Sequence, residues 1–275
     1  MLRFAVAGSP LSTPPPGGTV EGIRRAAALG LDAMEIEWVR NVPQNRERMA
    51  EIRHTAEELG MILTAHAPYY VNLNAREKEK LAASVKRVTD ALAMAEIAGA
   101  RSVCVHPAFY LGMDPPAAYA NVRKATDGIM KLKNKLFPDV NLAFETMGKT
   151  AQFGTIEEVL KLSREFDIYP CVDLAHMHAR ANGGYNTEEA FRDVLDMYAD
   201  YLGKKSLGTM HLHYSGIAYT AKGERKHVPL RESDARWKDC LRVLKERHAG
   251  GVLVCESPAL EEDTLLLQRT YATLK

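Results

Sequence analysis

Short apolar segments that favour β-strands alternate with longer amphipathic segments along the whole of this 275-residue chain. There are eight strand candidates, namely RFAVAG, DAMEIEW, ILTAHAP, SVCVHPA, NLAFET, YPCVDLAH, TMHLHYS and GVLVCESP. Alternation of strands with helices implies a parallel sheet, and eight such units imply that the sheet closes into a barrel. We therefore predict an α/β fold in which residues 1–275 form one (β/α)₈ TIM barrel domain. An open doubly wound sheet is the alternative, but the first strand is not followed by the Gly-x-Gly-x-x-Gly that dinucleotide-binding sheets of that kind usually have.

Composition places the chain among ordinary globular proteins and leaves its partners open. Lys and Arg total 36 against 35 Asp and Glu, so the formal net charge of +1 neither requires nor excludes nucleic acid. No apolar stretch is long enough to span a membrane, and the apolar run in MLRFAVAGSP is too short for a signal peptide, so we expect no membrane association. The four cysteines form no CxxC pair, which indicates free thiols in a reducing compartment. We expect a cytoplasmic monomer.

Side chains that can bind metal ions stand at the ends of the later strand candidates. They are His66, His106, Glu145, Asp173 with His176, His211 with His213, and Glu256. The residues two positions before these are small, as a narrow inner layer beneath a site requires: Thr64, Cys104, Ala143, Cys171, Thr209 and Val254. Barrel active sites are built at the C-terminal ends of the strands. One buried histidine is most often an ordinary core residue, but six strand ends that agree indicate a metal site there.

The mixture of ligands narrows the choice of metal and of chemistry. Several imidazoles with three carboxylates favour zinc, manganese or iron over magnesium or calcium. The number of candidate ligands exceeds what one catalytic ion uses, so we expect two or more ions. Clustered divalent ions suit the hydrolysis of phosphate esters, because they stabilise both the attacking and the leaving oxygen.

These motifs, taken together, resemble the endonuclease IV family of apurinic/apyrimidinic endonucleases, within the xylose isomerase-like barrel superfamily. The similarity rests on AHAPYYVNL, VHPA, FET, VDLAH, MHLH and CESP, which match in order and spacing over roughly residues 60–260. The resemblance implies hydrolysis of the phosphodiester 5′ to an abasic site in duplex DNA, with zinc as the cofactor.

The resemblance also implies roles for individual residues. His66, His106 and Glu145 would hold one zinc ion. Glu145, the expected catalytic residue, would bridge to a second ion, and His176 and His227 would help to hold a third. The expected ligands of the second ion are Glu145, Asp173, His211 and Glu256, and the expected substrate-binding residues are Tyr69, Arg40 and His213.

Two segments depart from the family pattern. The family has an Asp two residues before the histidine that corresponds to His227, and this chain has Arg225 there. Glu224 is adjacent but would have to redirect its side chain, so we expect two firmly bound ions and a third that is weak or needs DNA. In the segment EIEWVRNVPQNR, Arg40 follows the pair Glu35 and Glu37 and could penetrate DNA, or the segment could be a solvated loop.

A sugar isomerase or epimerase of the same superfamily is the alternative function. Such an enzyme would use Glu145, Asp173, His211 and Glu256 around one main metal ion. It has no need of a second group of imidazoles, so His66 and His106, together with His227, favour the nuclease.

Overall fold

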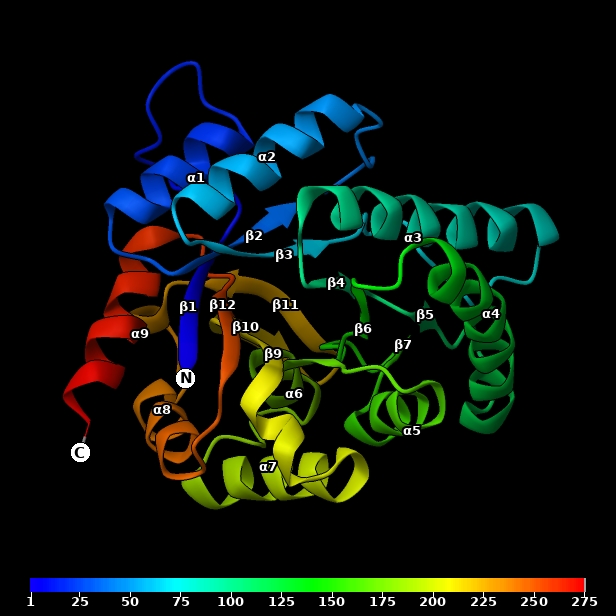
Figure 1. The fold of residues 1–275 in the computed structure, drawn as a ribbon. Coiled ribbons are helices and arrows are strands. Elements are labelled where there is room, and N and C mark those ends of the chain that lie inside the picture. The colour runs from blue at the N-terminus through cyan, green and yellow to red at the C-terminus, as the bar shows by residue number, and fades with distance from the viewer. Residues whose placement is uncertain (275) are drawn as a thin grey trace.

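Eight parallel strands form the central sheet of this protein, whose computed structural model describes residues 1–274 (Figure 1). The strands are β1 (Leu2–Ala7), β2 (Ala33–Glu37), β3 (Ile62–His66), β4 (Ser102–Val105), β6 (Asn141–Phe144), β8 (Cys171–Asp173), β9 (Met210–Tyr214) and β12 (Gly251–Cys255). They pair in the order β6-β4-β3-β2-β1-β12-β9-β8. A parallel bridge between Glu145 and Cys171 joins the two ends of this order, so the sheet curls into the predicted barrel.

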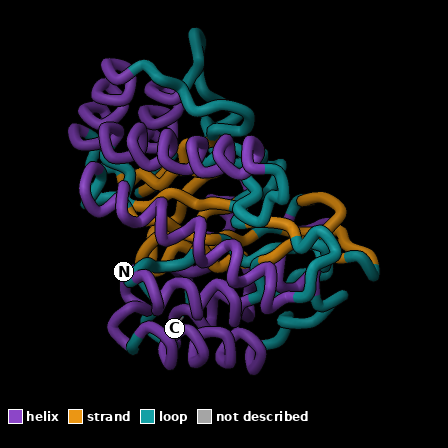
Figure 2. The backbone as a smooth tube through the Cα atoms, turned by 90° about the vertical axis from the view of Figure 1, so that its right-hand side faces the viewer, coloured by secondary structure: helices purple, strands orange, loops and turns teal. Residues whose placement is uncertain are grey.

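Helices surround the barrel on its outer side (Figures 1 and 2). They are α1 (Thr19–Ala28), α2 (Arg46–Glu58), α3 (Lys78–Ala98), α4 (Pro115–Leu136), α5 (Ile156–Phe166), α7 (Glu188–Leu202), α8 (Trp237–Glu246) and α9 (Glu261–Thr273), with short 3₁₀ turns at Lys204–Thr209 and Leu230–Glu232. The short helix α6 (Leu174–Arg180) instead follows β8 directly at the mouth of the barrel. Local sequence explains their ends: Thr155 and Glu158 form a capping box at the start of α5, and Gly99 ends α3 in a left-handed conformation. Within residues 1–274 we find no helix that is both long and apolar enough to cross a membrane.

The alternation of side chains along each strand decides what faces the helices and what faces the barrel axis. Outward residues such as Ala65, Phe144 and Val172 pack against helices in two large apolar clusters. Inward residues beneath the C-terminal mouth are small, for example Cys104 and Ala143. The strands therefore direct larger polar side chains toward the mouth.

The segment after β9 contains a β-hairpin. Its strands are β10 (Gly216–Thr220) and β11 (Gly223–Val228), which pair antiparallel. A second small sheet joins β5 (Ala108–Phe109) to β7 (Gln152–Phe153). The hairpin contacts the loop after β6, where Glu224 N donates to Gly148 O at 2.9 Å, so it lies over the mouth of the barrel.

Gly223 should be important for docking of this hairpin. Its φ is +90°, and a Cβ atom there would lie 2.1 Å from Gly148 O. We expect Gly223→Ala to lower the free energy of unfolding by about 1–3 kcal/mol, because backbone strain and the close approach both oppose a side chain. Gly208→Ala is the control, since nothing lies within 4 Å of its added Cβ. Urea denaturation of both variants tests this, and equal stabilities would contradict it.

Candidate metal centre

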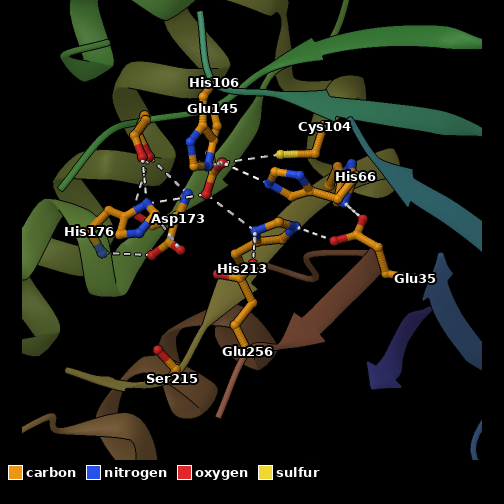
Figure 3. A network of polar contacts seen from close by, with 12 residues as sticks. Glu35, His66, Cys104, His106, Glu145, Asp173, His176, His213, Ser215 and Glu256 are labelled. Atoms are coloured by element: carbon orange, nitrogen blue, oxygen red, sulfur yellow. Dashed lines mark hydrogen bonds and ion pairs between the residues drawn. The ribbon is translucent and has the colours of Figure 1, made fainter. Parts of the chain in front are cut away.

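Glu145, which directly follows β6, carries a fully buried carboxylate at the centre of a cluster of imidazoles (Figure 3). Its Oε2 lies 2.8 Å from His106 Nε2 and 3.4 Å from His66 Nε2. Its Oε1 lies 3.1 Å from His176 Nδ1 and 3.3 Å from His213 Nδ1. Each oxygen of one carboxylate thus faces a different pair of imidazoles, which is the arrangement that a ligand shared between two cations requires.

Asp173 and Glu256 bring two further carboxylates to the cluster. Asp173 ends β8 and its Oδ2 lies 3.3 Å from His176 Nδ1, while Glu256 follows β12 and its Oε1 lies 3.3 Å from His213 Nδ1. Glu145 Oε1, Asp173 Oδ2 and Glu256 Oε2 are buried and accept no hydrogen bond from the described residues. Because buried carboxylate oxygens without partners are costly, these atoms indicate cations as their partners.

The electrostatics of the cluster differ from one group to the next. Burial alone would raise the pKa of Glu145, but the imidazoles of His106 and His176 hold it well below its usual range. Although burial opposes its charge, the close approach of its Nε2 to the Glu145 carboxylate raises the pKa of His66 to about 10. Burial raises the pKa of Asp173 well above its usual value, and the nearby Glu256 adds to this. Protons therefore balance part of the negative charge, and a bound metal ion would displace them.

The positions of His211 and His213 differ from those expected. The two residues are two positions apart on β9, so their side chains share one face of the strand, and this face is turned toward the barrel axis. The register pairs His213 with Asp173 and His211 with Cys171, one layer farther from the mouth. His211 Nε2 accordingly lies 2.9 Å from Glu35 Oε2. The structure thus places His213, rather than the expected His211, beside Glu145 and Glu256, whereas His211 lies against Glu35.

Glu35 and Glu37 also lie in the cluster, which was not expected from the sequence. Glu35 is fully buried, and its Oε1 lies 2.9 Å from His213 Nε2. Glu37 Oε1 is buried without a hydrogen-bond partner among residues 1–274, and burial raises the pKa of this carboxyl to about 8. The pattern Glu-Ile-Glu within a strand was the available signal, because alternation turns both acids toward the barrel axis.

An open cavity of 540 Å³ lies above the cluster. The residues that line it include Glu37, His106, His176 and Glu256 of the cluster and, beside them, Tyr69. The ring centroid of Tyr69 lies 5.2 Å from that of His66 and 5.3 Å from that of His106. Arg40 is exposed on the loop after β2 and does not line this cavity, so the structure brings Tyr69 to the site and leaves Arg40 outside it.

A third group of candidate ligands forms under the hairpin. His176 Nε2 lies 3.6 Å from Glu224 Oε2 and 3.4 Å from His227 Nε2. Since β11 pairs Glu224 with Tyr219 but Lys226 with Ala218, Arg225 is the extra residue of a β-bulge.

The bulge shifts the alternation of side chains by one residue. Ile217 and Tyr219 share one face of β10, so their partners His227 and Glu224 share one face of β11. Arg225 is exposed instead. The third group therefore has a carboxylate, although the position that the resemblance assigned to an Asp holds Arg225.

Comparisons with known proteins agree with this architecture. A family model described as xylose isomerase-like TIM barrel matches residues 23–272, so the chain belongs to that family. An uncharacterized protein of Methanocaldococcus jannaschii is 38% identical over 274 residues, which is 100% of this chain and 98% of that protein.

The similarity to endonuclease IV expected from the motifs is also confirmed. A probable endonuclease 4 of Pediococcus pentosaceus is 26% identical over 63% of this chain and 57% of its own length. One from a Geobacillus species is 27% identical over 67% of this chain and 63% of its own length, so each match spans less than two thirds of the relative.

Solved structures share the fold with both enzyme classes considered. Endonuclease IV from Thermus thermophilus superposes with a TM-score of 0.74 at 22% identity, over 98% of this chain and 97% of that one. A D-tagatose 3-epimerase-like protein superposes with a TM-score of 0.70 at 17% identity, over 98% and 97%. At these identities the likeness shows the fold alone.

We expect binding of an ion by the third group to depend on Glu224 and not on Arg225. Glu224→Ala removes the only carboxylate of the group formed by His176, Glu224 and His227, and should lower the metal content by one ion per chain. Arg225→Ala is the matched control, because this exposed residue of the bulge faces away, and its metal content should equal that of the parent. Elemental analysis after dialysis measures all three proteins. Equal metal content in all of them would show that this group holds no resident ion.

Proposed function

We propose that this protein is a metal-dependent endonuclease that hydrolyses the phosphodiester 5′ to an abasic site in duplex DNA. The observation that carries the proposal is the shared carboxylate of Glu145, whose two oxygens face different pairs of imidazoles. The probable endonuclease 4 relatives support the same reaction class. A site for several ions suits this reaction, since phosphodiester cleavage needs stabilisation of charge on both the attacking and the leaving oxygen.

Three groups of side chains fit divalent cations, and we propose zinc, with manganese or iron as alternatives. The first group is His66, His106 and Glu145, and the third is His176, Glu224 and His227. The second is Glu145, Asp173, His176 and Glu256, and His213 Nδ1 lies 3.3 Å from an oxygen of Glu145 and of Glu256. Ions bound there would supply the Lewis acidity and the activated water of the reaction. Cys104 Sγ donates to Glu145 Oε2 at 3.2 Å and would orient the shared carboxylate.

Residues around the cavity would bind the DNA. Tyr69 is 43% exposed beside the cluster, and its ring offers a surface on which a base or the abasic sugar can stack. Lys149 lines the cavity. Lys222 is exposed in the turn between β10 and β11, and Lys226 is exposed on β11. These cations lie next to the mouth of the barrel and would contact phosphates, although the net charge of the whole chain is only +1.

A sugar epimerase is the second candidate, and one observation favours it. Asp173, His176 and Glu256 together with Glu145 form a four-residue group that could serve one metal ion. The epimerase structures of the same fold support this reading. His66 and His106 distinguish the epimerase from the endonuclease. Both imidazoles lie near Oε2 of Glu145, and an enzyme with one metal ion does not need them there.

Replacing the shared carboxylate should abolish incision. Glu145→Gln keeps the size of the side chain and removes its charge, so incision of a duplex with one abasic site should fall by at least about 100-fold. Glu189→Gln, at an exposed position on α7, is the matched control and should cleave at the parent rate. Single-turnover cleavage with metal-loaded proteins measures the effect, and an unchanged rate in Glu145→Gln would refute the assignment.

Removing the imidazoles of the first group should separate the two candidate functions. The double variant His66→Ala with His106→Ala should lose one ion and its activity on abasic DNA, because two groups of ligands act on one phosphate. An epimerase would keep most of its turnover of ketoses in this variant. His54→Ala, on the exposed face of α2, serves as the control. If the double variant interconverts a ketose at the parent rate, the endonuclease proposal is wrong.

A further inference from the structure

A second cavity, of 470 Å³, opens at the opposite end of the barrel from the metal centre. It is lined by the first residues of several strands, among them Arg3 on β1, Ser102 on β4 and His211 on β9. The interior of a TIM barrel is normally filled by layers of bulky side chains. Here the inward residues Ala5 and Ala33, which pack beside Ile62 and Val252 of the cavity lining, are small.

The lining of this base cavity has the charge of an anion site. Arg3 and Arg101 both line it, and no Asp or Glu does among the residues that the structure describes. Neither guanidinium makes an ion pair or a side-chain hydrogen bond within residues 1–274. Arginine with neighbouring hydroxyl groups is the usual combination that recognises phosphate oxygens, because all of these groups donate hydrogen bonds.

A buried hydroxyl without a partner points to the same ligand. Thr64 is 2% exposed and lines the cavity, yet its Oγ1 has no hydrogen-bond partner among the described residues. Leaving such a group unsatisfied is unfavourable. The neighbouring hydroxyl of Ser102 lies 3.1 Å from His211 Nδ1, and His211 is in turn held by Glu35. These groups are already paired with one another, and a ligand oxygen in the cavity would satisfy Thr64.

We propose that the base of the barrel is a binding site for a small phosphate monoester. The phosphate would lie between Arg3 and Arg101 and accept a hydrogen bond from Thr64. Ile62, Met210 and Val252 also line the cavity and would contact the carbon skeleton of the ligand. The volume lies within the range of small-molecule pockets. This site uses none of the candidate metal ligands of the three groups, so it stands or falls independently of the proposed endonuclease activity.

Calorimetric titration of the metal-loaded protein with glycerol 3-phosphate tests the proposal. We expect the double variant Arg3→Gln with Arg101→Gln to bind at least tenfold more weakly at this site than the parent. Arg46→Gln, at an exposed position at the start of α2, is the control and should bind as the parent does. Glycerol without phosphate should not bind. Equal binding by the parent and the double variant would overturn the proposal.

Two further measurements guard against indirect effects and against anions at the metal centre. Thr64→Val keeps the shape of the side chain and removes only the hydroxyl, so it should fold normally and bind glycerol 3-phosphate several-fold more weakly. Crystals soaked in tungstate, a phosphate analogue, should show an anomalous peak beside Arg3 and Arg101. A peak confined to the mouth near Glu145, together with parent-like binding by Thr64→Val, would show that the base holds no anion.

Discussion

The contact on which the rest of this site depends is that of the Glu145 carboxylate with four imidazoles. A carboxylate with no exposed surface can remain ionised only if positive charge surrounds it. His66 and His106 contact one oxygen, and His176 and His213 contact the other. Strands from both sides of the barrel must therefore bring their ends to one point, and the closed sheet is what makes this possible.

Layers above and below hold this contact in place. Below it, Glu35 contacts both His211 and His213, and Cys104 donates to Glu145. Above it, the hairpin brings Glu224 against His176, and the backbone of Glu224 is fixed by Gly148 O. Groups that contact a ligand from behind fix its orientation and its protonation state, so the geometry of the site depends on residues that need not touch substrate.

The fold of this family does not decide between its chemistries. Endonuclease IV and a D-tagatose 3-epimerase-like protein superpose on the chain with TM-scores of 0.74 and 0.70. Function must be argued from the side chains at the mouth of the barrel. His66 and His106 give the Glu145 carboxylate a second set of neighbours, and the proposal of phosphodiester hydrolysis rests on this doubling of the site.

Alternating strand and helix patterns determined the barrel, and the polar residues at the strand ends determined where its site lies, because both follow from local periodicity. Tertiary structure alone decided three details. His211 and His213 point to the same face of β9, so the sequence alone does not show which of them reaches Glu145. The register with β8 places His213 there. A bulge at Arg225 turns Glu224 toward His227, and pairing with β10 creates that bulge. The hollow base was also not predictable, since it depends on how the sizes of side chains from separate strands add up across the barrel axis.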